Sequence, residues 1–198
     1  DNGVVEVGYK KEQRYTIGLE VKPALEGQNG MDLTKDSTFL ITGAAGSITS
    51  AITADLARAS GGTFYLLDLT PKPDPENADI KQFAKDKEGL KRDIFARLKA
   101  AGEKATPVIV DKELATIERS YSALAAIKSV ENAGGTAHYY SVNLLDNKAV
   151  AKAIKDIRKK AKKIDVLLHA GGLEISRLLP DKSPQEFDLV FDVKSDGW

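Results

Sequence analysis

The sequence predicts an α/β fold: a doubly wound parallel sheet with a helical insertion after its second strand. The main observation is a regular alternation of short apolar runs with stretches of helical periodicity. Strands are expected at 38–42, 63–68, 136–142 and 164–169, with helices over 47–60 and 147–160. Apolar runs of this kind are typical of strands buried on both faces. Strands joined through helices favour a parallel sheet with helices on both sides.

Capping residues indicate where the first and last helices begin and end. Gly61 and Gly62 follow the first helix directly, as is common at helix C-termini. Near the end of the chain, Ser183, Pro184 and Glu186 provide an N-cap, a proline at the first helical position and an acid at the third. This pattern predicts a helix that begins at residue 184.

The regular alternation is interrupted after the second strand. Residues 71–83 are polar and rich in proline, and are expected to form a loop. Two helical stretches follow, near 86–101 and 111–133, and Gly134 and Gly135 end the second. We interpret these helices as an insertion within the α/β fold.

The N-terminal segment, residues 1–36, has no convincing period. Short alternating strands are suggested by Val4, Val5 and Val7, and then by Tyr15, Ile17, Leu19 and Val21, and residues 27–30 resemble a turn. We interpret this segment as an arm, or as the remnant of a preceding structural subdomain, and residues 37–198 as the principal domain. The chain begins without methionine and stops soon after a helical stretch, so it is expected to be a piece of a longer protein.

The composition restricts the possible function classes. A chain of 198 residues with 42% hydrophobic and 29% charged residues is typical of a globular protein. The formal net charge of +0 argues against nucleic-acid or membrane-surface binding. The absence of cysteine excludes disulfides and a cysteine nucleophile, and no metal site is expected. No signal peptide or membrane span is evident, so the expected location is cytoplasmic.

The turn after the first buried strand is the main candidate for ligand binding. Small residues there allow close approach of a pyrophosphate, and the following helix offers free N–H groups and the positive end of its dipole. The candidate residues are Thr42, Gly43, Ala45, Gly46, Ser47 and Ile48. Thr49 occupies the position of the last glycine of the G-x-G-x-x-G fingerprint, so a plain tight turn is the alternative. The strand before and the helix after favour a dinucleotide site of the Rossmann type.

Asp68 ends the second strand, where an acid can accept hydrogen bonds from both ribose hydroxyls. A carboxylate there would repel a 2′-phosphate, so Asp68 favours NADH, although the nearby Lys72 complicates this preference. The alternative is an acid that caps a turn. Leu69, which follows, is also assigned to the cofactor site.

Two further strand ends provide candidate cofactor contacts. His169, Ala170, Gly171 and Gly172 follow a buried strand, where the cofactor crevice of an open α/β sheet lies. His169 is expected to pack or to orient a loop rather than to perform acid–base chemistry, and the two glycines could form only a turn. Asn143 and Leu144 follow the third strand, and the Asn143 side chain could bind an adenine edge or cap the next segment.

These motifs resemble a known family. The stretches TGAAGSIT, LLDLT and HAGG resemble the short-chain dehydrogenase/reductase superfamily. Two longer stretches resemble the ketoreductase domain of polyunsaturated-fatty-acid synthases and type I polyketide synthases: ALAAIKSVENAGGTAHYYSVNLLD and HAGGLEISRLLPDKSPQEFDLVFDVKSDGW. The resemblance covers about residues 37–198, the cofactor-binding part of such a domain.

The resemblance implies an NADPH-dependent reduction of a β-ketoacyl thioester to a β-hydroxyacyl thioester. Lys194 matches the family's catalytic lysine, which binds the nicotinamide ribose and lowers the pKa of a proton-donating tyrosine. The family's catalytic serine and tyrosine would lie beyond Trp198, so the fragment itself is expected to be inactive. The implied partners are an acyl carrier protein bearing the β-ketoacyl chain and neighbouring synthase domains.

The cofactor stays open between NADPH and NADH. The family's arginine after the second strand is replaced here by Asp68 and Leu69, which puts the family's preference for NADPH in doubt. Two alternatives to a synthase ketoreductase stay open as well. One is a non-catalytic Rossmann-like structural domain of a synthase, and the other is a stand-alone NAD-dependent alcohol dehydrogenase.

Overall fold

The computed structural model describes residues 7–22 and 31–197. The chain divides into two compact units, Asp1–Asp32 and Leu33–Trp198. The predicted boundary between residues 36 and 37 stays a prediction. The strand suggested by Val4 and Val5 and the turn at 27–30 lie outside the described residues.

The first unit contains one β-hairpin. Strand β1 (Val7–Lys10) pairs antiparallel with β2 (Gln13–Thr16). Lys11 and Glu12 join them with φ angles of 48° and 65°, as a tight hairpin turn requires. All residues of the two strands are exposed, and residues 17–22, where alternation suggested a further strand, form none.

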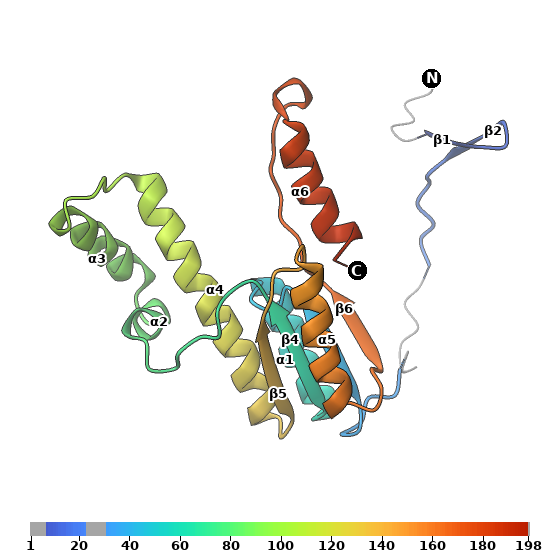
Figure 1. Cartoon of the computed structure of the whole chain (residues 1–198), viewed down its shortest axis with the longest axis horizontal. Coiled ribbons are helices and arrows are strands. Elements are labelled where there is room, and N and C mark those ends of the chain that lie inside the picture. The colour runs from blue at the N-terminus through green and yellow to red at the C-terminus, as the bar shows by residue number, and fades with distance from the viewer. Residues whose placement is uncertain (1–6, 23–30, 198) are drawn as a thin grey trace. The chain divides into compact units, whose positions relative to one another are not determined.

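The second unit contains a four-stranded parallel sheet in the order β5-β4-β3-β6 (Figure 1). Its strands are β3 (Thr38–Thr42), β4 (Thr63–Asp68), β5 (Thr136–Ser141) and β6 (Val166–His169). Three neighbouring pairs, β3 with β4, β3 with β6 and β4 with β5, are all parallel. The predicted doubly wound parallel sheet is therefore confirmed.

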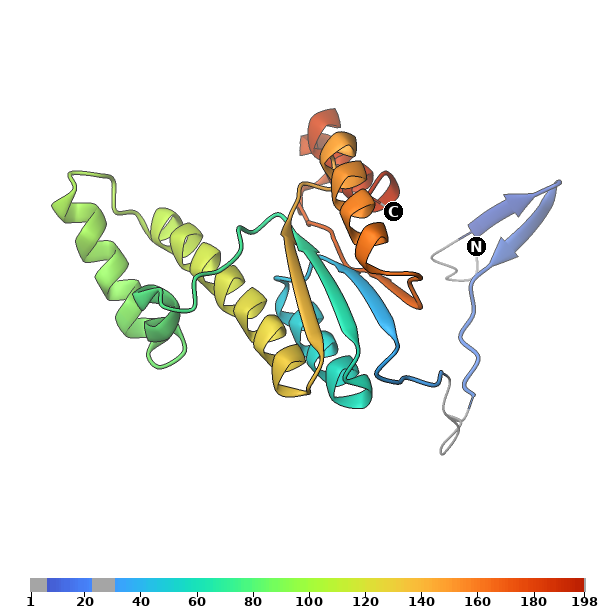
Figure 2. The same cartoon turned by 60° about the horizontal axis from the view of Figure 1, so that its bottom comes forward.

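Helices cover both faces of this sheet (Figure 2). Two of them, α1 (Ser47–Ser60) and α4 (Pro107–Asn132), lie on one face, and α5 (Asn147–Lys160) lies on the other. Successive residues of β4 point to opposite faces, so Phe64 and Leu66 pack with α1 and α4, while Tyr65 and Leu67 pack with α5. Burial on both faces explains why the strand sequences are continuously apolar.

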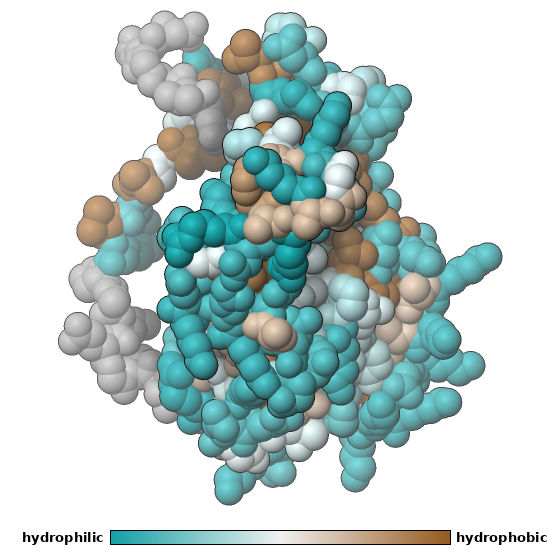
Figure 3. Space-filling model, turned by 90° about the vertical axis from the view of Figure 1, so that its left-hand side faces the viewer, coloured by the Kyte–Doolittle hydropathy of each residue, from teal (hydrophilic) through white to brown (hydrophobic). Residues whose placement is uncertain are grey.

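The predicted insertion consists of α2 (Ala78–Phe83), α3 (Lys87–Ala100) and the N-terminal half of α4. These helices share a separate small core, made of Leu90, Ile94, Leu98, Val110 and Leu114. Figure 3 views the molecule from the side of the insertion, and the surface on this side is mostly hydrophilic. The insertion thus buries its own apolar residues and keeps a polar exterior.

Two boundaries in the insertion differ from the sequence prediction. The expected loop over 71–83 was wrong in its second half, because Asn77 accepts a hydrogen bond from the N–H of Ile80 and starts α2. Helix α4 begins at Pro107 rather than near 111, because the Thr106 side chain caps it and proline is favoured in the first helical turn.

The C-terminal region follows the predicted pattern, with one difference. Strand β6 begins at Val166 rather than 164, and the Asp165 side chain accepts a hydrogen bond from the N–H of Thr38 instead. A short 3₁₀ turn, η1 (Leu179–Asp181), precedes α6 (Pro184–Ser195). Ser183 and Glu186 form the predicted capping box at the start of α6. Among the described residues, no helix is both long and apolar enough to span a membrane.

Candidate functional site

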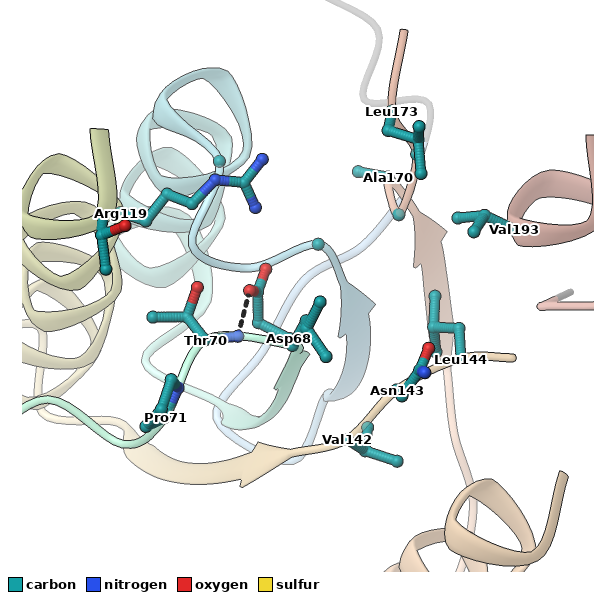
Figure 4. Close-up of a pocket in the computed structure, with 16 residues that line it drawn as sticks. Asp68, Thr70, Pro71, Arg119, Val142, Asn143, Leu144, Ala170, Leu173 and Val193 are labelled. Carbon is teal, nitrogen blue, oxygen red and sulfur yellow. Dashed lines mark hydrogen bonds between the residues drawn. The ribbon is translucent and has the colours of Figure 1, made fainter. Parts of the chain in front are cut away.

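An open pocket of about 490 Å³ lies where the strands of the parallel sheet end, a volume within the range of small-molecule sites. It is bordered by the turn after β3, the loop after β4, the segments after β5 and β6, and one face of α4 (Figure 4). The lining residues are Gly43, Gly46, Asp68, Leu69, Thr70, Pro71, Thr116, Arg119, Val142, Asn143, Leu144, Ala170, Gly171, Gly172, Leu173 and Val193. The strand order reverses between β3 and β6, which is where open α/β sheets bind ligands.

The turn after β3 brings the backbone of two strand ends into contact. Gly43 has a φ of 67°, and a Cβ at this position would lie 2.5 Å from the carbonyl oxygen of Ala170. Gly46 donates its N–H to the carbonyl of Gly43 at 3.0 Å, and a Cβ on Gly46 would lie 3.2 Å from that same oxygen. Glycine at 43 is therefore required by both the backbone conformation and the space available.

Helix α1 begins at this turn without a side-chain cap. Its N-cap residue is Gly46, and the first turn holds no acid. The other five α-helices of the described residues each have a side chain that accepts a hydrogen bond at the N-terminus, from Asn77, Asp86, Thr106, Asp146 and Ser183. Ser47 and Ile48 are at least partly exposed, so the start of α1 is open to a ligand that accepts hydrogen bonds.

Asp68 holds the turn and the loop after β4 together. Its Oδ2 accepts a hydrogen bond from the N–H of Ala45 at 2.9 Å, and its Oδ1 accepts one from the N–H of Thr70 at 2.8 Å. The residue is only 5% exposed. The turn-capping role, which the sequence left as an alternative, is thus present in the structure.

Strand β5 fixes the loop that follows Asp68. The hydroxyl of Tyr139 donates to the carbonyl of Thr70 at 2.9 Å, and the hydroxyl of Ser141 donates to the carbonyl of Leu69 at 3.4 Å. Burial raises the pKa of Tyr139, and the negative charge of Asp68 raises it further. The phenol therefore stays neutral and keeps its hydrogen bond to the carbonyl of Thr70.

Behind the glycine turn, Thr42 links β3 to the segment after β6. Its hydroxyl oxygen accepts a hydrogen bond from the N–H of Gly171 at 3.1 Å and shares a second one, of 2.9 Å, with Nδ1 of His169. Burial lowers the pKa of His169, and the charge of Lys194 lowers it further. Backbone hydrogen bonds to Val193 and Lys194 raise this pKa and offset part of the decrease. His169 thus packs behind the pocket wall through its hydrogen bond with Thr42, and its assignment to the cofactor site stays a prediction.

The segments after β5 and β6 pack against each other at the pocket. A Cβ on Gly171 would lie 2.5 Å from Cδ1 of Leu144, so the leucine fills the space that a side chain would need. Asn143 accepts a hydrogen bond from the N–H of Leu145 at 3.1 Å, which is the capping role that the sequence left open. Lys194 lies against Gly172, where a Cβ would be 2.8 Å from its Cε.

Comparison with known proteins identifies the family. The family model described as short chain dehydrogenase matches residues 88–198, more than half of the chain. The chain belongs to the short-chain dehydrogenase family. The match includes the strand ends at β5 and β6 and the helix that carries Lys194.

A curated relative of this chain is one of the subunits of the polyunsaturated fatty acid synthase of Thraustochytrium sp.. The two are 29% identical over the whole chain, which spans only 7% of that synthase polypeptide. The resemblance to synthase ketoreductases stated from the sequence is thus supported by a relative of this kind.

Solved structures share the fold. A ketoreductase domain from the bacillaene assembly line matches 96% of the chain, with a TM-score of 0.59 and 16% identity, over 34% of its own length. A short chain dehydrogenase from Mycobacterium paratuberculosis, bound to NAD, matches 83% of the chain with a TM-score of 0.53 and 16% identity, over 47% of its own length. The chain therefore spans less than half of these proteins, and the likeness shows a common fold.

The structure gathers nine of the predicted site residues around one pocket: Gly43, Gly46, Asp68, Leu69, Asn143, Leu144, Ala170, Gly171 and Gly172. The other predicted residues adjoin the pocket without lining it. Thr42 and His169 lie behind the wall, Ala45 is buried, and Lys194 packs on Gly172. Ser47 and Ile48 lie at the open start of α1.

Sequence reasoning missed the contribution of α4 to this pocket. Thr116 and Arg119, one helical turn apart on α4, line it together with Thr70, Pro71, Val142, Leu173 and Val193. A signal for α4 was available in the topology. A crossover helix between two parallel strands passes the edge of the sheet where the first strand ends, and residues at that level face the strand ends.

Proposed function

We propose that this chain forms the nicotinamide-binding part of a ketoreductase within a multidomain synthase. The reaction reduces a β-ketoacyl thioester on an acyl carrier protein to the β-hydroxyacyl thioester. The single observation that carries the proposal is the start of α1, which has no side-chain cap and borders the pocket through Gly43 and Gly46.

The residues present fit a dinucleotide. A diphosphate can accept hydrogen bonds from the first N–H groups of α1, which no side chain of the described residues caps. Gly43 and Gly46 border the pocket with backbone alone, which allows the close approach that a diphosphate needs. The amides of Ser47 and Ile48 would hold the diphosphate, and the segments after β4 and β5 would hold the adenosine.

The nicotinamide end would lie toward the segments after β6 and toward α6. There the backbone of Ala170, Gly171 and Gly172 borders the pocket, beside the side chains of Leu173 and Val193. When bound, a reduced nicotinamide would supply the hydride for the ketone carbon and become oxidised, and an acid of the complete catalytic site would supply the proton for the ketone oxygen.

Lys194 is proposed as the catalytic lysine of this site. It sits in the last turn of α6, which the predicted capping box starts, and it packs against Gly172 at the pocket. An ammonium at this place can donate hydrogen bonds to ribose hydroxyls and stabilise a nearby phenolate.

The proposal also covers organisation and partners. Residues 37–198 would form the cofactor-binding domain, with residues 1–36 as an arm or part of a structural subdomain. The relative from Thraustochytrium belongs to a fatty acid synthase, which supports neighbouring synthase domains and a carrier protein as partners.

Calorimetric titration of the 198-residue chain with NADPH and NADH tests the cofactor proposal. We expect at least one of them to bind in a one-to-one ratio, and Gly46→Trp to abolish binding while the far-ultraviolet circular dichroism is retained. A folded chain that binds neither would favour the non-catalytic scaffold.

The substrate proposal needs the synthase polypeptide that contains this chain. When this polypeptide is mixed with a β-ketoacyl thioester and the reduced cofactor that the chain binds, the cofactor should be oxidised. Lys194→Ala should slow this oxidation. Turnover only in the reverse direction, with a simple alcohol reducing the oxidised cofactor, would favour the alcohol dehydrogenase alternative instead.

A further inference from the structure

Among the described residues that line the pocket, Arg119 is the only one with a positive charge. Its side chain leaves α4 and extends into the pocket, toward the turn between β3 and α1 (Figure 4). The residue is exposed, so its guanidinium is accessible to a ligand. No side-chain acid among the described residues forms an ion pair with it.

Several neighbouring charges of the insertion are paired with one another. Arg97 binds both carboxylate oxygens of Asp79, at 3.1 and 3.0 Å. Glu118 pairs with Lys87 at 3.1 Å. On the preceding part of α4, Asp111 pairs with Lys91 at 2.6 Å. These two acids of α4 are thus engaged with α3, and Arg119 keeps its positive charge for the pocket.

On the loop after β4, the residue that could select NADH is Asp68, and its carboxylate is engaged in structural hydrogen bonds. The Asp68 carboxylate uses one oxygen for the N–H of Ala45 and the other for the N–H of Thr70, and the residue is almost fully buried. It therefore holds the turn with both oxygens, and because it also lines the pocket, the positive charge of Arg119 is needed to offset its charge beside a 2′-phosphate. Leu69, 65% exposed, stands where the family resemblance places an arginine and offers no charge of either sign.

From this arrangement we infer that Arg119 binds the 2′-phosphate of NADPH and gives the site its preference for that cofactor. The inference rests on the proposed function, because it requires the adenosine to lie beside the loop after β4. A guanidinium offers two parallel N–H donors to a phosphate, which makes arginine well suited to this role. The charge is supplied by the insertion helix and not by the strand end.

The insertion then has a function. Arg119 lies one turn beyond Thr116 on α4, whose N-terminal half packs in the small core with α3. The hydroxyl of Thr116 donates its hydrogen bond to the carbonyl of Lys112 at 3.1 Å. Arg119 is therefore the residue on this face of α4 that would donate hydrogen bonds to a phosphate. The helices of the insertion hold α4 in place and so position Arg119 over the pocket.

Two variants and their controls test the inference by binding rather than by turnover. Calorimetry measures the affinities of the chain for NADPH, NADH, adenosine 2′,5′-bisphosphate and adenosine 5′-monophosphate. We expect Arg119→Gln to weaken the binding of NADPH and of the bisphosphate about ten- to a hundredfold, the usual effect of losing a charged hydrogen bond. The affinity for NADH should stay nearly unchanged. Arg119→Lys keeps the charge but loses the paired donors, so it should fall between the wild type and Arg119→Gln.

Arg158→Gln and Lys72→Gln are the matched controls. Arg158 is an exposed arginine on α5, on the other face of the sheet, so its removal changes the net charge equally without touching the pocket. Lys72 is exposed and follows the pocket loop, and it is the competing cation. Both variants should keep the wild-type ratio of NADPH to NADH affinity.

The possible outcomes separate this inference from the proposed function. If wild type binds both cofactors and Arg119→Gln leaves their ratio unchanged, the inference is overturned and the proposed function stands. A wild-type preference for NADH, or a loss of preference in Lys72→Gln alone, overturns the inference in the same way. If a folded chain binds neither cofactor, the proposed function fails and the inference fails with it.

Discussion

Oδ2 of Asp68, at the end of β4, accepts a hydrogen bond of 2.9 Å from the N–H of Ala45 in the turn after β3. Its other carboxylate oxygen accepts the N–H of Thr70. One buried side chain therefore sets the positions of two pocket walls at once. An acid at the end of the second strand is thus a structural part of the glycine turn, whatever it contributes to a ligand.

Asp68→Asn should destabilise the domain. The amide keeps only one accepting oxygen, so one of the two backbone N–H groups loses its partner in a buried position. An unsatisfied buried donor costs about 1–3 kcal/mol, which urea denaturation can measure. Asp74→Asn is the control, because Asp74 accepts a hydrogen bond from the N–H of Glu76 at an exposed site. Equal losses in the two variants would contradict the role assigned to Asp68.

Gly43→Ala should disturb the pocket more than a comparable substitution elsewhere. The positive φ of 67° strains any other residue, and the new Cβ would lie 2.5 Å from the carbonyl oxygen of Ala170. Gly102→Ala isolates the first effect, because Gly102 has a φ of 73° and open space around its Cβ position. We expect strain alone, about 1–2 kcal/mol, for Gly102→Ala and a larger loss for Gly43→Ala.

Cofactor titration of the same two variants completes this prediction. Gly43→Ala should bind NADPH or NADH more weakly than wild type, because the turn must move away from Ala170. Gly102→Ala should bind as wild type does, since Gly102 is not among the pocket residues. If the two variants lost equal stability and equal affinity, steric contact at Gly43 would not be what requires the glycine.

The regular parts of the fold could be predicted because their signals are local. The apolar runs of β3 and β4 predicted strands buried on both faces, and the capping box at Ser183 and Glu186 fixed the start of α6. Each of these signals lies within a few residues of the element that it specifies. The missed helix α2 had a local signal as well, the N-cap Asn77, but the surrounding prolines favoured the interpretation as a loop.

The composition of the pocket could be predicted only in part. The residues that follow strands, such as Gly43 and Asn143, could be placed at one edge of the sheet because parallel strands end together there. The topology brings α4 past this edge of the sheet, but it does not show that Arg119 is the residue at the level of the strand ends, because that depends on the packing of α4 against α1. The sequence also could not show that the Asp68 carboxylate accepts hydrogen bonds from both Ala45 and Thr70 while it lines the pocket.

Lys194→Met should raise the pKa of His169. Burial and the Lys194 charge hold the pKa of His169 below the ordinary histidine value of 6.5, and the variant removes the second of these causes. The chain has two histidines, so nuclear magnetic resonance titration can follow both. His138 is the internal control, because its pKa is lowered by burial and by Lys160 and should not respond. A His169 that titrates at or above 6.5 in wild type contradicts the expectation.

The same lowered pKa fixes the direction of a stability change with pH. Below the unfolded value of 6.5 the unfolded chain takes up a proton on His169 that the folded chain resists. The free energy of unfolding should therefore decrease as the pH falls from about 6.5 through the folded pKa. His169→Gln should flatten this dependence, with the remainder due to His138, whose pKa is lowered as well. A stability that rises on acidification over this range would overturn the assignment.

Ile94→Ala should loosen the insertion and, through α4, the pocket. Ile94 is fully buried in the small core with Leu90 and Val110, and truncation of such a residue costs about 2–5 kcal/mol. Because this core is separate from the one beneath the sheet, hydrogen exchange should accelerate in α3 and in the N-terminal half of α4 more than in β3 and β4. Val108→Ala, an exposed aliphatic truncation on α4, should change exchange little.

The effect of Ile94→Ala on ligand affinity connects this core to the pocket. If the insertion positions Arg119, the loss should fall on NADPH and on adenosine 2′,5′-bisphosphate, while NADH affinity stays close to that of wild type. An equal loss for both cofactors would instead mean that the substitution disturbs the sheet and the glycine turn. Unchanged exchange in α3 would show that the small core does not hold the insertion together, since a buried isoleucine would then have been removed without consequence for the helices around it.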